Sequence, residues 1–279
     1  MAVSGISQVD LTIEEVISAI TTQTLIQNSV ALQIPGVWDR SGEVRPGMDT
    51  LDMIELAELA VQDVNEDGSA MTPQTISPAA SKLELDNHKS IPFSITKRGD
   101  LQSKIALVQR TVANGARTLA AQVDDAIFAE AVSAAGTTET APGTDGLADI
   151  LLAKKAFDLA DVPKEMRALV GAPEWINDKL LSTNTVIRAN EYGSDAPIRT
   201  GFVASIYDFM IFESSSSSLP SDGFIAFGME GLAFARQRAM EFESENKVLE
   251  QRIDYAMTHL YGVKSTAASN PRLFVFDPA

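Results

Sequence analysis

Apolar residues recur at three- and four-residue steps through residues 100–135, and this recurrence predicts one long helix. The positions on the shared face are Leu101, Ile105, Val108, Val112, Leu119, Val123 and Ile127. With a rise of about 1.5 Å per residue, such a helix is roughly 50 Å long, which is too long for an ordinary compact domain of this size. The pattern therefore predicts an extended molecule.

The chain before this helix combines an apolar arm with a long polar excursion. Residues 10–34 predict a short amphipathic helix that ends before Pro35. Residues 37–99 are punctuated by glycine and proline and are acidic in the middle, which is typical of an excursion of two strands. Neither half has enough apolar residues to form a core alone, so we expect the excursion to pack on the body or on another subunit.

The two halves of the excursion differ in how clearly they indicate strands. In the returning half, Leu83 and Leu85 alternate with charged residues, and Phe93 and Ile95 continue the alternation, which predicts a strand. The outgoing half, residues 49–64, fits a helix about as well as a strand, and periodicity alone does not decide between them.

After the long helix the pattern changes to short helices and strands. Helices are predicted at 147–159, with Thr144 or Asp145 as its cap, and from Pro173 onward; strands are predicted at 168–171, 201–212, 223–227, 232–238, 247–254 and 273–276. Residues 255–261 have a helical pattern. We expect the five serines of 214–218 to form a solvated loop rather than to supply a nucleophile.

Composition limits the classes of function. The 279 residues are 45% hydrophobic, enough for a large core, and 38 acidic against 22 basic residues give a formal charge of −16. This charge argues against a surface that holds nucleic-acid phosphates closely, although it is compatible with enclosing DNA. The chain has no cysteine, no secretory signal and no apolar stretch near 18 residues, so we expect a soluble, unprocessed protein with no membrane contact.

The candidate chemical groups do not form a recognisable site. His88 and His259 have no metal-binding spacing; we expect His88 to be exposed and His259 to pack near Tyr261. Asp124 and Asp125 are neighbours in the long helix and point about 100° apart, so we interpret them as exposed charges rather than an acid–base pair. The sequence also has no phosphate-binding loop and no GxSxG elbow. We therefore expect no catalytic residue, no metal and no cofactor.

Charged residues gather late in the chain around a predicted hairpin. They are Arg236, Arg238, Glu241, Glu243, Glu245, Lys247, Glu250, Arg252 and Asp254. This pattern fits a solvated face and a set of inter-subunit ion pairs equally well, and arginines would matter most if the set were desolvated against a neighbour.

The order of these elements resembles the major capsid protein of tailed bacteriophages with the HK97-type fold. Residues 55–63, 71–76 and 82–95 look like the two arms of the family's extended E-loop, residues 101–135 look like its spine helix, and residues 201–215, 261–264 and 272–276 look like axial-domain and closing strands. The resemblance implies an α+β fold in which residues 49–64 are strand. It further implies an N-terminal arm at 1–36, an E-loop at 37–99, a peripheral domain with the spine helix at 100–138 and 232–264, and an α/β axial domain at 139–231 and 265–279.

The resemblance also implies a structural protein rather than an enzyme. Many copies would assemble in the host bacterial cytoplasm into hexamers and pentamers of an icosahedral virion shell. The shell would enclose double-stranded DNA without sequence-specific binding, and scaffolding, portal and decoration proteins are further partners in such assemblies. The chain begins close to its arm, which implies a separate scaffolding protein or none. The candidate inter-subunit contacts are Lys82, His88, Lys89, Lys97, Arg98, Arg236, Arg238, Glu241 and Glu243.

Two alternatives remain at the level of sequence. An encapsulin-type compartment shell would keep the fold and require a docking groove for a cargo peptide. A soluble carboxylate-dependent enzyme would use groups such as Asp124 or His259 and would form a small oligomer.

Overall fold

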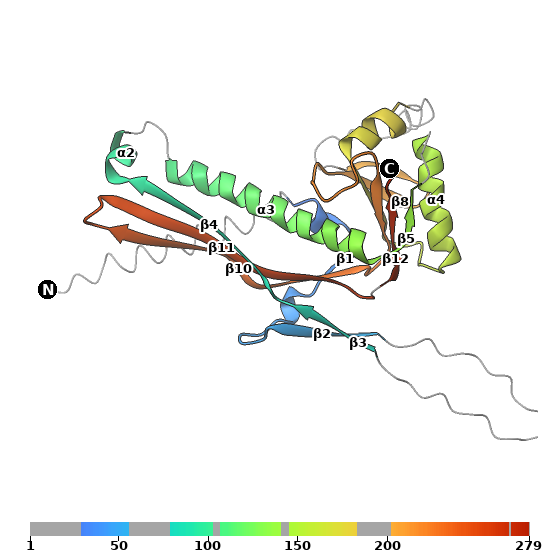
Figure 1. The fold of residues 1–279 in the computed structure, drawn as a ribbon, viewed down its shortest axis with the longest axis horizontal. Coiled ribbons are helices and arrows are strands. Elements are labelled where there is room, and N and C mark those ends of the chain that lie inside the picture. The colour runs from blue at the N-terminus through green and yellow to red at the C-terminus, as the bar shows by residue number, and fades with distance from the viewer. Residues whose placement is uncertain are drawn as a thin grey trace, which may run out of the picture.

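The computed structural model describes residues 29–55, 79–102, 107–140, 145–182, 202–267 and 269–278. It consists of an elongated body built on long strands and a second body built on a six-stranded sheet, with a two-stranded sheet beside the first (Figure 1). Only residues 29–34 of the arm helix expected at 10–34 fall within the described part. No helix in this part is long and apolar enough to cross a membrane.

The elongated body is a four-stranded sheet covered on one face by a long helix. The strands are β1 (Val37–Asp39), β10 (Leu232–Lys247), β11 (Arg252–Ser265) and β4 (Asn87–Thr96), in the order β1-β10-β11-β4. Helix α3 (Leu107–Ala134) lies along this sheet (Figure 1), and the shorter α2 (Lys97–Gln102) precedes it. The predicted long helix is confirmed from Leu107 onward; its expected first turns fall in α2 and in residues 103–106, which lie outside the described part.

The predicted apolar stripe explains why α3 lies on the sheet. Val112, Ala116 and Leu119 form one core cluster with Phe242 of β10 and Met257 of β11. Gly115 permits the close approach, because a Cβ atom there would lie 1.9 Å from the methyl carbon of Met257. Helix and sheet are thus held together by buried apolar contact, which favours a single rigid elongated body.

The second body is a mixed sheet with helices packed on it. Its strands are β5 (Ala135–Glu139), β12 (Asn270–Phe276), β9 (Phe224–Phe227), β6 (Arg167–Gly171), β8 (Phe209–Glu213) and β7 (Phe202–Ile206), in that spatial order. Helix α4 (Gly146–Leu159) begins after Asp145, whose side chain accepts a hydrogen bond from the backbone N–H of Leu147 at 3.1 Å. The short helix η3 (Trp175–Leu180) places Trp175 against Phe224, with ring centroids 4.6 Å apart. The predictions of both helices and of the cap at Asp145 are confirmed.

The two-stranded sheet lies on the other side of the elongated body from α3 (Figure 1). It pairs β2 (Thr50–Glu55) with β3 (Ala79–Glu84) in antiparallel register. Leu51, Met53 and Leu83 are buried in a cluster with Ala233 and Ala235 of β10. The described base of the excursion therefore packs on its own body, one of the two possibilities that the sequence left open.

The excursion is divided between two sheets. Of residues 37–99, only β2 and β3 belong to the two-stranded sheet, whereas β1 and β4 pair with β10 and β11 in the four-stranded sheet. The single returning strand predicted from the alternation is therefore two strands, separated at Leu85 and Asp86. In the outgoing half, residues 50–55 are strand, and residues 56–64 lie outside the described part.

Three further predictions of secondary structure are corrected. Residues 255–261, predicted as a helix, are the middle of β11, because their alternate side chains Tyr255, Met257 and Tyr261 pack towards α3. The strand predicted at 247–254 contains the turn between β10 and β11. The strand predicted at 201–212 is a hairpin of β7 and β8, turned at Tyr207 and Asp208, which both have positive φ.

Candidate assembly surfaces

The N-terminal end of the described chain is fastened to the middle of α3. Ser29 precedes the short helix η1 (Ala31–Gln33), and its hydroxyl donates to the carboxylate of Asp124. The backbone N–H groups of Val30 and Ala31 donate to the same carboxylate at 3.0 and 3.1 Å. Burial raises the pKa of Asp124, although the hydrogen bonds oppose that rise. The prediction of an exposed charge at Asp124 is wrong, because this carboxylate is 6% exposed and caps another segment.

The predicted loop of five serines also meets α3. Ser216 donates a hydrogen bond to Asp125, the neighbour of Asp124, and Ser214 is buried. A groove of about 530 Å³ lies beside this contact, and Arg117 and Val30 contribute to its walls. The loop thus joins the second body to the long helix, and these contacts give it a structural role.

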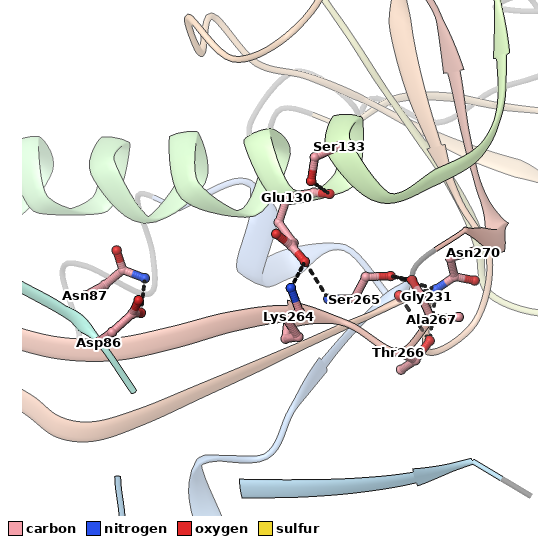
Figure 2. Close-up of polar contacts among 10 residues, drawn as sticks. All are labelled: Asp86, Asn87, Glu130, Ser133, Gly231, Lys264, Ser265, Thr266, Ala267 and Asn270. Atoms are coloured by element: carbon pink, nitrogen blue, oxygen red, sulfur yellow. Dashed lines mark hydrogen bonds and ion pairs between the residues drawn. The ribbon is translucent and has the colours of Figure 1, made fainter. Parts of the chain in front are cut away.

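The chain crosses between the two bodies close to the end of α3, and polar side chains hold this junction (Figure 2). Glu130 of α3 accepts a hydrogen bond from the backbone N–H of Ser265 at 3.0 Å, and its carboxylate lies 3.3 Å from the ammonium group of Lys264. Both partners belong to the end of β11, immediately before the chain passes into β12. Glu130 therefore fixes the long helix to the crossing point.

Asn270, the first residue of β12, completes the junction (Figure 2). Its Nδ2 group donates to the carbonyl oxygen of Gly231 at 2.6 Å and to the hydroxyl of Thr266 at 2.9 Å. Its Oδ1 atom accepts from the backbone N–H of Arg272 at 3.0 Å. One buried amide thereby joins the β9–β10 connection to the β11–β12 connection, which sets the relative placement of the two sheets.

A groove of about 560 Å³ lies beside the junction. It is next to the end of β11 that follows Tyr261, where β11 no longer pairs with β4. Its walls come from β3, the start of β4, the last turns of α3 and the end of β11. Lys82, Glu84 and Asp86 line one wall, and Glu130 and Lys264 line the other. The groove is therefore lined by charges of both signs, and Lys82 is the one candidate contact residue among its lining residues.

The remaining candidate contacts are distributed along the elongated body. His88 and Lys89 are exposed on β4, an edge strand of the sheet. Lys97 and Arg98 begin α2, next to the turn between β10 and β11, because the N–H of Lys97 donates to the carbonyl oxygen of Gln251 at 2.9 Å. These residues do not converge on one site.

On β10 the structure brings two of the candidate residues together. The guanidinium of Arg238 lies 2.6 Å from the carboxylate of Glu241, and Glu243 is exposed two residues further. Since Phe242 faces α3, the alternation of the strand directs Glu241 and Glu243 to the opposite face. Further ion pairs accompany this face: Lys247 with Asp254 at 3.0 Å, and Arg252 with Glu250 at 2.7 Å and with Asp254 at 3.0 Å.

His259 lies inside the interface of sheet and helix. It is 2% exposed and stacks on Tyr261 with ring centroids 5.0 Å apart, which confirms the predicted packing. Burial, together with the charge of Arg236, lowers its pKa to about 4. His88, in contrast, is exposed, as predicted.

Sequence reasoning missed two groups of exposed apolar side chains. Val248 and Leu249, at the turn of the β10–β11 hairpin, are 60% and 100% exposed. Leu151, Leu152, Leu159, Met166 and Tyr207 are exposed on α4 and on the turns of the second body. The signal for the first group was present, because two adjacent apolar residues interrupt a charged hairpin, but the turn was predicted as strand.

The sequence matches no described protein family and no curated protein. The fold, in contrast, has close counterparts among solved structures. One, described as Mycobacterium phage Che8, is 23% identical and has a TM-score of 0.63, with coverage of 82% of this chain and 84% of that chain. The capsid structure of the cyanophage P-SCSP1u is 13% identical, with a TM-score of 0.66 and coverage of 88% and 86% of the two chains.

This chain has the HK97-type capsid fold. A third structure, the capsid of Ralstonia phage GP4, is 11% identical, with a TM-score of 0.65 and coverage of 86% of each chain. The α+β class predicted from the sequence, with its long spine helix and two-stranded excursion, is confirmed. In the terms of this fold, α3 is the spine helix and β2 and β3 form the described base of the E-loop.

Proposed function

We propose that this chain is the major capsid protein of a tailed bacteriophage. Many copies form the hexamers and pentamers of an icosahedral head, which encloses double-stranded DNA without reading its sequence. The observation that supports this proposal best is the extent of the likeness to phage capsids, which covers most of both chains rather than one shared motif.

The shape of the molecule supports assembly as its function. The four-stranded sheet extends far from the second body, and β2 and β3 form a separate layer on the face opposite α3 (Figure 1). A closed symmetric shell requires several complementary surfaces on each subunit, and projecting hairpins provide them without a large compact interface. The function proposed here is therefore binding between copies, with no catalysed reaction and no cofactor.

We assign the parts of the chain as the family resemblance implies. Residues 1–36 are the N-terminal arm and 37–99 the E-loop. Within residues 37–99, β1 and β4 are strands of the four-stranded sheet. Residues 100–138 with 232–264 form the peripheral domain, and 139–231 with 265–279 form the axial domain. Assembly in the bacterial cytoplasm and contact with scaffolding, portal and decoration proteins belong to the same proposal.

The candidate contact residues keep their proposed role between subunits. Lys82, His88, Lys89 and Arg98 are exposed, so they are accessible to a neighbouring copy. Arg238 and Glu241 form a pair within the subunit, which leaves Glu243 beside them as an exposed acceptor. Exposed pairs contribute about 0–1 kcal/mol each, so we expect these residues to set orientation more than affinity.

The two alternative functions have weaker support. An encapsulin-type compartment would share the fold, but the solved structures named above are of phages. The enzyme hypothesis depended on Asp124 or His259. Asp124 is occupied by three hydrogen-bond donors, and His259 is packed on Tyr261 between the sheet and α3.

Electron microscopy tests the proposal under two conditions: the chain expressed alone, and the expressed chain mixed with an extract of phage-infected cells. We expect closed shells of uniform size, and DNA inside particles recovered from a complete infection. A small oligomer on size-exclusion chromatography under both conditions would contradict the proposal. Shells that contain a protein cargo and no DNA would favour the compartment alternative.

The E-loop has a separate test within this function. Deletion of residues 65–77, which lie outside the described part, should leave the helical content of the chain unchanged and lower the yield of shells. Circular dichroism and sedimentation of particles measure the two effects. Shells as stable and abundant as those of the parent chain would show that the loop has no role in assembly.

A further inference from the structure

The four-stranded sheet of the elongated body has one long edge strand. The strand order β1-β10-β11-β4 places β4 at an edge, and among the described residues no further strand pairs with it. β4 has ten residues, whereas β1 at the other edge has three. An unpaired edge presents a row of N–H and C=O groups that can pair with a strand of another molecule. The protein therefore needs a means of keeping this edge unpaired before and during contact between copies.

The hydrogen bonds around β4 show which of its amide groups face the open edge. The N–H of Lys97, directly after β4, donates to the carbonyl oxygen of Gln251 at 2.9 Å, so it points towards β11. The direction of the amides alternates along a strand, and β4 pairs with β11 from Thr96 to Asn87 without a register shift. The amides of odd-numbered residues in β4 therefore point towards β11, and those of even-numbered residues point away from it.

Pro92 occupies the middle of this open edge. It lies opposite Ala256 of β11 and is exposed. Its even number places its nitrogen on the side away from β11, and a proline nitrogen has no hydrogen to donate. The ladder between β4 and β11 thus loses no hydrogen bond. The outward amides of Ser90 and Ser94, in contrast, are separated by a position that cannot pair with an added strand.

The same side of the sheet is also blocked beyond the start of β4. β11 continues past Tyr261, the last residue that pairs with β4, to Ser265. The N–H of Ser265 donates to the carboxylate of Glu130 at 3.0 Å, as Figure 2 shows, so this amide already has an acceptor within the subunit. A strand added in line with β4 would have to displace Glu130. This side of the sheet is therefore blocked at two separate places.

The opposite edge is protected in a different way. Beyond the short strand β1, the N–H of Arg236 in β10 donates to the hydroxyl of Ser41 at 3.1 Å. Register shifts then interrupt the pairing of β10 with β11 between Arg236 and Glu241. A bulged strand is a poor template for a regular partner. Both edges of the sheet thus carry features that oppose strand addition.

We propose that Pro92 prevents β4 from pairing with a strand of another copy, so that copies approach this side of the elongated body only through side chains. This inference rests on the proposed function, in which many copies must meet in one defined arrangement. Main-chain pairing along a polar edge accepts several registers, whereas side chains such as His88 and Lys89, exposed on β4, distinguish one arrangement from another. The proline therefore acts on the specificity of assembly rather than on the stability of the fold.

Pro92→Thr tests the proposal, because threonine favours strands and restores an outward N–H. Sedimentation velocity of dissociated subunits should shift to larger species for this variant, at concentrations where the parent subunits do not associate. Urea unfolding should show that the variant is at least as stable as the parent. Ser94→Thr is the matched control, because it introduces the same residue at another exposed, outward position of β4 that already has an N–H. This control should sediment like the parent.

A double variant separates protection of the edge from a local effect of the proline. Ser90→Pro with Pro92→Thr moves the proline by two positions, so it again removes an outward N–H and costs no hydrogen bond to β11. We expect the double variant to sediment like the parent. Association of the double variant to the same extent as Pro92→Thr would overturn the proposal. A Pro92→Thr protein that sediments like the parent would do so as well.

Amide hydrogen exchange examines the edge in the parent protein itself. In intact shells the amides of Ser90 and Ser94 should exchange about 100-fold faster than those of Ile91 and Phe93, which point towards β11. Mass spectrometry with fragmentation that resolves single amides measures both sets. Equal protection of the two sets would show that a strand of another copy pairs with β4, which contradicts the proposal. A parent chain that forms no shells would instead refute the proposed function, and sedimentation of the subunits would still decide the role of Pro92.

Discussion

The carboxylate of Asp124 in α3 accepts a hydrogen bond from the hydroxyl of Ser29, a residue 95 positions earlier in the chain. The N–H groups of Val30 and Ala31 donate to the same carboxylate, so a side chain of the spine helix caps the start of η1. Ala31 and Ile34 continue the attachment by packing into the main core. Whatever position residues 1–28 take in a shell, the described end of the arm is therefore fixed to α3.

Asp124→Ala should destabilise the subunit by about 1–3 kcal/mol, because three donors lose their acceptor, two of them in buried hydrogen bonds. Urea unfolding of dissociated subunits measures this change. Asp125→Asn is the matched control, because Asp125 is the next residue and accepts only the Ser216 hydroxyl among the contacts described above. Equal unfolding midpoints for the two variants would show that Asp124 does not fasten the arm.

The stability of the subunit should fall in mild acid because of His259. Its pKa is lowered from an ordinary value of 6.5 to about 4, so the unfolded chain binds a proton at a pH where the folded chain does not. The stabilisation is complete above pH 6.5 and is lost as the pH falls towards 4. At pH 5 the loss is about 2 kcal/mol. The raised pKa of Asp124 acts in the opposite direction in more acidic solution.

Urea midpoints at pH 7 and pH 5 test this dependence. His259→Phe keeps an aromatic ring against Tyr261 and removes the titrating group, so the difference between the two midpoints should shrink. A parent and a variant with the same pH dependence would exclude His259 as its source.

The sequence predicted those elements whose pattern is decided locally. The apolar stripe of α3 and the cap of α4 at Asp145 both depend on spacings of a few residues, and both are confirmed. The alternation at 83–95 correctly predicted strand, but it did not predict that the strand divides at Leu85. The two halves differ only in their partners, because β3 pairs with β2 and β4 pairs with β11. Register with a distant strand leaves no mark on the local pattern.

The surfaces were less predictable than the elements, for the same reason. Asp124 has the same sequence context as its neighbour Asp125, yet only Asp124 is fully buried, because Ser29 and η1 pack over it. Residues 255–261 have a helical pattern when taken alone, but they form the middle of β11 between β10 and β4, where alternate side chains such as Met257 pack towards α3.

Gly262 should not tolerate a side chain. A Cβ atom there would lie 2.2 Å from the backbone oxygen of Glu84, where β3 crosses β11. Gly262→Ala must therefore displace the base of the two-stranded sheet, at a cost of about 1–3 kcal/mol. Gly42→Ala is the control, since its Cβ meets nothing within 4 Å. Unfolding midpoints and shell yields should both fall for Gly262→Ala alone, and unchanged values would contradict the close contact.

Asn270→Ala should loosen the junction between the two bodies. The carbonyl of Gly231 and the hydroxyl of Thr266 each lose the donor that Asn270 supplies, and the N–H of Arg272 loses its acceptor. We expect a loss of about 2–3 kcal/mol, measured by urea unfolding. Ser269→Ala, at the exposed neighbouring position, should change little. If both variants unfolded alike, the amide network would not hold the junction.

Leu249 should affect the shell without affecting the subunit. Its side chain is fully exposed at the turn between β10 and β11, and the adjacent Val248 is 60% exposed. An apolar side chain in water contributes nothing to the fold, so Leu249→Ser should leave the urea midpoint of dissociated subunits unchanged. In the shell, burial of this side chain against a neighbouring copy would stabilise each contact by about 1.5–3 kcal/mol. Repetition over many copies makes the loss measurable as dissociation of the variant shells at lower denaturant concentration. Shells of equal stability would show that this turn remains in solvent after assembly, and a lowered subunit midpoint would show that Leu249 packs within its own chain.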